Sequence, residues 1–89
     1  MITVQVPPAW RAHTGAAQVS VAATCVGELA QALAQQYPAL QGWLFDGDGS
    51  LKRWVNVFVN GQDVRLLQGA DTPISPADDV RIILAVAGG

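Results

Sequence analysis

Apolar and polar residues alternate in two short segments near the start of the chain. Residues 2–6 and 19–23 both carry an apolar side chain at every second position. A period of two is typical of a strand with one buried face. Pro7 and Pro8 end the first segment, because neither can donate a ladder hydrogen bond. We predict two strands that form a hairpin with a long connection.

The pattern then changes to the spacing of a helix. Thr24 precedes this segment and is expected to be its N-cap, accepting a hydrogen bond from an early helical N–H. Pro38 ends it, so the helix should be about 11–13 residues long. One apolar stripe follows from the spacing, and it consists of Val26, Leu29, Ala30, Leu33 and Tyr37.

The second half of the chain returns to strand patterns. Residues 39–50 form a connection in which Leu40, Trp43 and Leu44 are expected to pack onto the core, with the DGDGS segment as the loop tip. A strand follows with valine at 55, 57 and 59. Asn60-Gly61 predicts a hairpin turn, because both residues adopt positive φ readily.

The return strand is expected to begin with Val64 and Leu66, and the last strand to run from Val80 to about Val86. One helix must then cover one face of a mixed sheet of four to five strands. The order predicts an α+β fold of the β-grasp (ubiquitin-like) type, with the first and last strands central and parallel. We expect one β-grasp domain at residues 1–84 and a flexible tail at residues 85–89.

Composition excludes several classes of protein. The chain has 89 residues and a net charge of −2. Its composition, 51% hydrophobic and 13% charged, is too apolar for a disordered protein. The five basic residues are scattered, so no face for nucleic acid is expected. No apolar run approaches the roughly 20 residues of a membrane span, and no signal peptide is recognisable. The single cysteine cannot form an internal disulfide, and these features together favour the cytoplasm.

Candidate metal and catalytic residues do not form a site in the sequence. Asp46, Asp48 and Ser50 are spaced like the start of a calcium loop, but Leu51 and Val57 stand where that loop needs Gly and Glu. We expect a solvated turn there and no metal site.

Four further residues carry side chains that could be reactive. His13 has no neighbouring His or Cys, so no metal is expected to bind it. Cys25, at a helix N-terminus, is either a reactive thiol or a small hydrophobe, and the second interpretation is favoured. Asp78 and Asp79 are interpreted as turn residues. No triad or nucleotide-binding motif is present, so the chain is not expected to be a self-sufficient enzyme.

The chain ends with small uncharged residues, AVAGG at positions 85–89. Five extended residues reach roughly 16–18 Å, and two terminal glycines fit a narrow channel that a Cβ would obstruct. The reactive group would be the α-carboxylate of Gly89. A free carboxylate is a poor acyl donor, so it would need activation, for example as a mixed anhydride with AMP. A sulfur nucleophile could then leave a terminal thiocarboxylate.

The whole pattern resembles the MoaD/ThiS-type ubiquitin-like sulfur carriers. The resemblance rests on the predicted strand order and on five stretches of sequence: TCVGEL at 24–29, YP at 37–38, VNVFVNGQDVR at 55–65, DV at 79–80 and AVAGG at 85–89. Three stretches are most similar to the carrier of the cysteine-biosynthesis branch: RAHTG at 11–15, VNVFVNGQDVR at 55–65 and AVAGG at 85–89. A small subunit of molybdopterin synthase and a thiamine sulfur carrier remain alternatives.

The resemblance implies a carrier that is a co-substrate of partner enzymes and binds no cofactor itself. An E1-like adenylating enzyme would use ATP to activate Gly89, and a sulfur-acceptor synthase would receive the Gly88-Gly89 tail. A metalloprotease or sulfurtransferase is a further possible partner. Two departures stand out: Leu84 and Ala85 occupy positions where the family often has prolines, and no arginine precedes the glycines. The second departure disfavours the remaining alternative, a protein modifier that is joined to lysines through Gly89.

A partner surface is expected beside the tail. If the valines at 55, 57 and 59 face the helix, Trp54 and Phe58 face outward, and Ile83 does so on the neighbouring strand. We hypothesise that these three side chains form an apolar docking patch that continues into Ala85, Val86 and Ala87. The alternative for Trp54 is a cap on the edge of the core.

Overall fold

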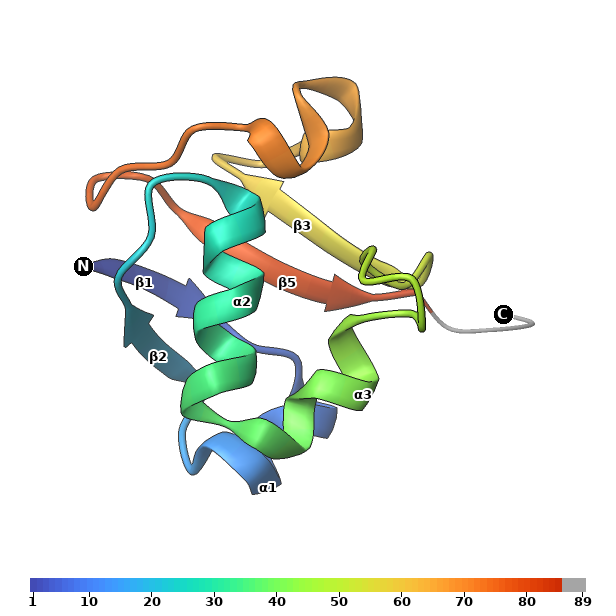
Figure 1. Ribbon diagram of the computed structural model, residues 1–89. Coiled ribbons are helices and arrows are strands. Elements are labelled where there is room, and N and C mark those ends of the chain that lie inside the picture. The colour runs from blue at the N-terminus through green and yellow to red at the C-terminus, as the bar shows by residue number, and fades with distance from the viewer. Residues whose placement is uncertain (86–89) are drawn as a thin grey trace.

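The computed structural model describes residues 1–85 and confirms the β-grasp fold (Figure 1). Five strands form one mixed sheet in the order β2-β1-β5-β3-β4, and helix α2 crosses one face of it. The strands and helices are β1 (Ile2–Gln5), α1 (Arg11–Thr14), β2 (Gln18–Val21), α2 (Val26–Gln36), α3 (Gln41–Leu44), β3 (Val55–Val59), β4 (Gln62–Asp63) and β5 (Val80–Leu84). Short 3-10 turns occupy Pro8–Trp10, Pro38–Leu40, Val64–Leu66 and Gly69–Asp71.

Strands β1 and β5 are far apart in the sequence but lie side by side and parallel, as expected for this fold. β1 pairs with β2 on its other side, and β5 pairs with β3, both antiparallel. The predicted hairpins therefore flank the parallel pair. The strands are shorter than expected at three ends, because β1 stops at Gln5, β2 stops at Val21 and β5 stops at Leu84.

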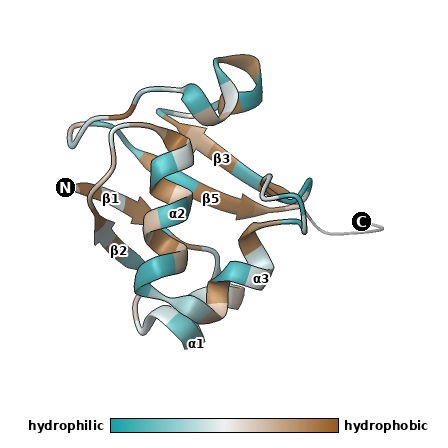
Figure 2. Cartoon of the chain, in the orientation of Figure 1, coloured by the Kyte–Doolittle hydropathy of each residue, from teal (hydrophilic) through white to brown (hydrophobic). Residues whose placement is uncertain are grey.

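The core lies between α2 and the inner face of the sheet. The apolar stripe of α2 is buried as its spacing predicts, except that Tyr37 follows the helix and is only partly buried. Val55, Val57 and Val59 are buried beneath the helix. Figure 2 shows the apolar colouring of the central strands where α2 crosses them. The core therefore combines one helical stripe and one face of the sheet with buried side chains from the connections, among them Trp10, Leu40 and Leu44.

The expected N-cap at Thr24 is wrong. Cys25 takes the cap position with extended backbone and makes no side-chain cap hydrogen bond. The Thr24 hydroxyl and N–H instead both donate to the Glu28 carboxylate, at 2.6 Å and 2.8 Å. The Thr24 hydroxyl therefore faces an acceptor rather than a helical N–H, and these two bonds lower the pKa of Glu28, the hydroxyl bond most.

Two further expectations need correction. Val64 and Leu66 do not begin the return strand: that strand is Gln62–Asp63, and a 3-10 turn follows because Asp63 caps it by accepting a hydrogen bond from the Arg65 N–H. Trp43 does not pack into the core with Leu40 and Leu44, since it is 44% exposed on the outer side of the short helix α3.

Candidate functional site

Ala85, the first residue of the expected tail, is held at the end of β5. The N–H of Ala85 donates to the Trp54 carbonyl at 2.8 Å, one residue beyond the last strand pair. Ala85 is itself exposed. The other predicted tail residues, Val86, Ala87, Gly88 and Gly89, lie outside the described residues. The last described residue, Ala85, is thus held next to Trp54.

The pairing of β3 with β5 determines which way each backbone group points. Hydrogen bonds link Ala85 to Trp54 at one end and Asn60 to Asp79 at the other. In an antiparallel pair such bonded positions alternate, so odd-numbered residues of β5 direct their backbone groups toward β3. Val55, at a non-bonded position, directs its N–H and carbonyl away from β5. Its N–H donates to the Lys52 carbonyl.

The guanidinium of Arg65 covers the outer edge of β3 next to Trp54. It donates to the Arg53 carbonyl at 2.6 Å, to the Val55 carbonyl at 3.2 Å and to the Asn56 side-chain oxygen at 2.6 Å. β4 is too short to pair with this part of β3. Arg65 therefore replaces the missing strand and fixes the backbone on both sides of Trp54, the residue that holds Ala85.

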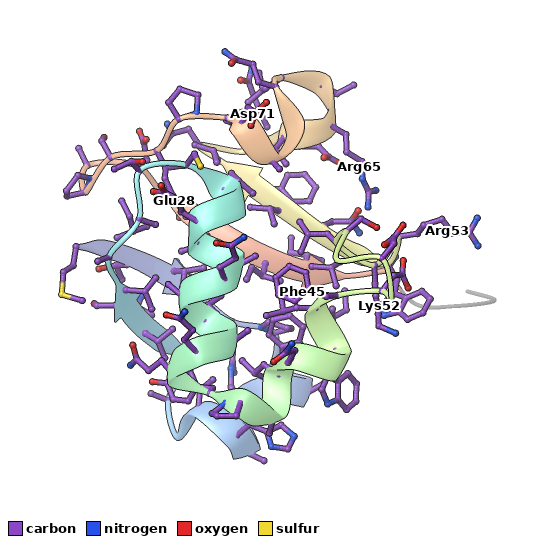
Figure 3. All side chains as sticks on the ribbon, viewed as in Figure 1. Glu28, Phe45, Lys52, Arg53, Arg65 and Asp71 are labelled. Carbon is purple, nitrogen blue, oxygen red and sulfur yellow. The ribbon has the colours of Figure 1, made fainter. Side chains whose placement is uncertain are left out.

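Two cationic side chains lie on the loop beside Trp54. The ammonium of Lys52 lies 5.0 Å from the centre of the Trp54 ring, a distance at which a cation and an aromatic face attract each other. Lys52 also approaches Asp46 at 4.0 Å. Figure 3 shows Lys52 and Arg53 near the end of β5, with Arg65 close by. The point where the chain end departs is thus bordered by an aromatic ring and basic groups.

The open face of the sheet carries the other two residues of the hypothesised docking patch. Ile83 is 48% exposed and Trp54 is 42% exposed, while Phe58 is half-buried. Ile83 lies opposite Asn56, so Phe58 is its diagonal neighbour and faces Arg81 directly. The expected outward orientation is observed, but polar Asn56 and Arg81 separate the apolar side chains.

The remaining candidate residues do not come together. Asp78 accepts hydrogen bonds from the Asn60 side chain and the Ser75 N–H, which lower its pKa, the Asn60 bond most. Asp79 contacts Arg81 at 3.2 Å. Asp48 accepts two bonds from Ser50, so its pKa is also lowered, chiefly by the serine hydroxyl.

Within residues 1–85, His13 and Cys25 are not grouped with other reactive side chains either. His13 stacks at a tilt on Trp43, with ring centres 6.4 Å apart, and Cys25 is a half-buried free thiol. Among residues 1–85, no cluster of three His, Cys, Asp or Glu side chains is arranged to hold a metal ion. In the same part of the chain, no helix has both the length and the hydropathy that a membrane crossing requires.

Sequence reasoning missed Arg65 and Lys52 as parts of the site. Arg65 reaches acceptors nine to twelve positions away across a hairpin, and no periodic pattern encodes such contacts. The position of Lys52 on the Trp54 ring depends on the fold of the 45–54 loop, which the sequence marks only as a turn. Trp54 itself was found from strand alternation.

Comparisons with known proteins agree along the whole chain. Residues 5–89 match the ThiS family. The sulfur carrier protein CysO of Mycobacterium tuberculosis is 38% identical over 91 residues, covering 99% of this chain and 98% of that protein. Small archaeal modifier protein 3 of Haloferax volcanii is 39% identical over 64 residues, covering 72% of this chain and 68% of that protein. Among solved structures, the Amycolatopsis orientalis BexX/CysO complex matches with a TM-score of 0.86 and 31% identity, covering all of both chains.

Proposed function

Because the chain belongs to the ThiS family of ubiquitin-like sulfur carriers, we propose that its working group is the α-carboxylate of Gly89. An E1-like enzyme transfers AMP from ATP to this carboxylate and releases pyrophosphate. Sulfide then attacks the acyl carbon and displaces AMP, which leaves a thiocarboxylate. If the donor is a persulfide, the attack gives an acyl disulfide, and a second thiol cleaves its S–S bond to yield the thiocarboxylate and a disulfide. The chain is a co-substrate in this scheme, and the sulfur leaves with the acceptor.

The observation that carries the proposal is the similarity to a sulfur carrier over nearly the full length of both proteins. The similarity also favours a cysteine-type pathway, since that relative is named CysO. A molybdopterin or thiamine pathway predicts a different acceptor and the same chemistry at Gly89. The fold supports the proposal because the last described residue, Ala85, is exposed and bonded to Trp54 directly after β5.

We propose that partner enzymes dock on the open face of the sheet next to that position. Ile83 and Trp54 are exposed there, and Phe58 adds a half-buried aromatic surface. Apolar and aromatic side chains in the centre of an interface contribute most of its binding energy. The patch would bring the partner's active site within reach of the last residues.

Conjugation to other proteins is a second candidate function. It is favoured by the similarity to small archaeal modifier protein 3. In that case the activated carboxyl of Gly89 forms an isopeptide bond with a lysine amine, and AMP or a thiol is the leaving group. Both functions need the same activation step and differ in what attacks Gly89 afterwards.

The activation step is tested with the adenylating enzyme of the same organism. The full chain should support exchange of radiolabelled pyrophosphate into ATP, and a variant lacking Gly89 should not. A matched variant, Leu66→Ala, changes an exposed side chain elsewhere and should behave like the wild type. Equal exchange with and without Gly89 would remove the basis for both functions. Addition of a sulfur donor and of target protein then distinguishes a thiocarboxylate from an isopeptide product.

A further inference from the structure

Strand β2 (Gln18–Val21) forms one edge of the sheet. The strand order places β1 on one side of β2 and no strand of residues 1–85 on the other. Figure 1 shows β2 at this border of the sheet, with β1 between it and β5. The backbone groups on the outer side of β2 are therefore candidates for pairing with another chain.

The ladder between β1 and β2 determines which backbone groups point outward. The Val6 N–H donates to the Ala17 carbonyl at 3.0 Å, which continues the register of this strand pair. Bonded and non-bonded positions alternate along an antiparallel pair, so the odd-numbered residues of β2 bond toward β1. Gln18 and Ser20 consequently direct their N–H and carbonyl groups away from the sheet. None of these four groups takes part in a hydrogen bond within residues 1–85.

The outer side of β2 lacks the features by which sheets usually avoid pairing with other chains. Exposed edges are commonly protected by charged side chains, proline, a bulge or a covering segment. Residues 16–24 contain no charged residue and no proline. The pairing of β1 with β2 advances one residue at a time along the whole strand, so no bulge interrupts it. β2 therefore presents a regular and neutral edge.

The opposite border of the sheet is protected. β4 has only two residues, and the Arg65 guanidinium covers the next part of β3 by donating to the carbonyls of Arg53 and Val55. Each copy of the chain thus offers β2 as its one regular open border within residues 1–85. Pairing of one such border with its own copy closes at a dimer, whereas pairing of two different borders would give an open-ended filament.

We infer that two copies of this chain associate through β2, as antiparallel neighbours that join two five-stranded sheets into one. A two-fold axis at Val19 places Gln18 opposite Ser20 of the second copy, and these two residues exchange both of their backbone hydrogen bonds. The axis repeats this pair, so both outward residues of each copy are satisfied. Main-chain hydrogen bonds supply the affinity in strand addition. The side chains of Gln18 and Ser20 are exposed and lie opposite each other on the open face, where the amide can bond to the hydroxyl.

The register follows from which backbone groups are free. The central register uses both outward residues of β2 and nothing outside the strand. A shift in one direction would oppose Ser20 to Ala16, whose N–H and carbonyl already bond to the Thr14 hydroxyl at 3.4 Å and 2.7 Å. A shift in the other direction would oppose Gln18 to Ala22, which lies beyond the end of β2.

The dimer leaves the proposed working end of the chain accessible. β1 and β5 separate β2 from β3, so Trp54 and Ala85 lie away from the interface in both copies. A partner enzyme can therefore engage either copy. The inference goes beyond the proposed function and does not depend on it.

The first test is sedimentation equilibrium of the full chain from micromolar to millimolar concentration. The weight-average mass should rise with concentration from that of one chain to that of two and then level off. Ser20→Pro removes an outward N–H that the fold does not use, and proline is tolerated on edge strands. Each copy then loses one bond across the interface, so the dissociation constant should rise at least about tenfold. Ser20→Ala is the control, because it keeps the N–H, and it should change the constant less than about threefold.

The second test uses the wild-type chain and needs no variant. Hydrogen exchange of individual amides is followed by NMR at low and at high protein concentration. The Gln18 and Ser20 amides should exchange rapidly in the dilute sample and slowly in the concentrated one. The Val19 and Val21 amides, which bond toward β1, should be protected in both samples.

Each outcome bears on the dimer alone. A chain that stays monomeric at millimolar concentration overturns the inference, and so do equal dissociation constants for Ser20→Pro and Ser20→Ala. A dimer in which the Gln18 and Ser20 amides still exchange rapidly has its interface elsewhere and also overturns it. If Ser20→Pro does not fold, the exchange of the wild-type amides decides. The chemistry at Gly89 is tested separately by pyrophosphate exchange, so either account can fail without the other.

Discussion

Asn60 joins a turn to the start of the last strand with one side chain. Its φ of 52° and the φ of 82° at Gly61 form the tight turn between β3 and β4. The amide group donates to Asp78 at 3.0 Å and accepts from the Asp79 N–H at 2.9 Å. The residue that best predicted a hairpin from sequence therefore also fixes where β5 begins, and that second role has no sequence signature.

Asp78 should make the stability of the fold depend on pH in the acidic range. Its folded-state pKa lies below the unfolded value, so its contribution is present above about pH 4 and is lost as the pH falls through the folded pKa. Asp78→Asn should lower the thermal midpoint near neutral pH and flatten its decline between pH 4 and 2. Thermal unfolding followed by circular dichroism across this range measures both effects. Asp71→Asn is the control, since Asp71 is exposed and its carboxylate accepts no hydrogen bond within residues 1–85, and it should leave the thermal midpoint near neutral pH unchanged.

Gly61→Ala should destabilise the fold by about 1 kcal/mol, because a Cβ is strained at positive φ even though space is open around it. Gly47→Ala is a matched change in a loop with open space and no positive φ. It should have an effect near zero or slightly stabilising. Urea unfolding of the two variants gives the difference, and equal midpoints would show that the turn at Asn60-Gly61 does not constrain the chain.

At the scale of elements, alternation and helical spacing sufficed for the strands, for α2 and for the parallel central pair. Apolar periodicity specifies which face is buried, so Val55, Val57 and Val59 were placed correctly. Local polar geometry was less predictable. The sequence predicts a cap acceptor at Thr24, which is a donor to Glu28, and a strand residue at Val64, which lies in a 3-10 turn. Such choices depend on partners that only the folded chain supplies.

Residues that reach the site only in the folded chain could not be identified from the sequence either. Trp54, Phe58 and Ile83 followed from alternation, whereas the Arg65 contacts depend on how the 62–66 segment folds back along β3. Nothing in spacing distinguishes Arg65 from Arg53. The structure separates them, because one guanidinium is bonded to backbone and the other makes no hydrogen bond within residues 1–85.

Arg65→Met tests the edge cover that this side chain provides. It keeps the aliphatic stem and deletes bonds to two carbonyls and one amide oxygen, so we expect a loss of about 1–3 kcal/mol in unfolding free energy. The Ala85 amide should also exchange faster, because Trp54 loses its fixed neighbours. Arg53→Met is the control and should change neither quantity. An unchanged exchange rate of the Ala85 amide in Arg65→Met would show that the edge of β3 does not determine how firmly Ala85 is held.

The whole molecule places a structural core on one side of the sheet and a candidate interface on the other. α2 covers the inner face of the sheet, whereas Trp54, Ile83 and Ala85 are exposed at the end of β5. This arrangement lets a partner engage the chain end without disturbing the core. It also explains how a domain without a catalytic constellation in its described part can take part in group transfer.

Phe58→Asp should weaken partner binding strongly while the domain stays folded. The half-buried ring lies on the open face, so a carboxylate there remains near solvent but removes apolar contact area. Leu66→Asp places the same charge on an exposed side chain away from the patch and should bind normally. Isothermal titration with the adenylating enzyme compares them. Normal binding of Phe58→Asp, or a collapsed circular dichroism spectrum, would contradict the docking patch.

Intact-mass spectrometry of the chain isolated from its native cell shows whether Gly89 carries sulfur. We expect a species heavier by the difference between one sulfur and one oxygen, and fragmentation should locate this exchange at Gly89. Alkylation with iodoacetamide should modify that group in a Cys25→Ala background, since a thiocarboxylate is nucleophilic. A chain whose terminal residue carries only an unmodified carboxylate under conditions of active sulfur assimilation would contradict it.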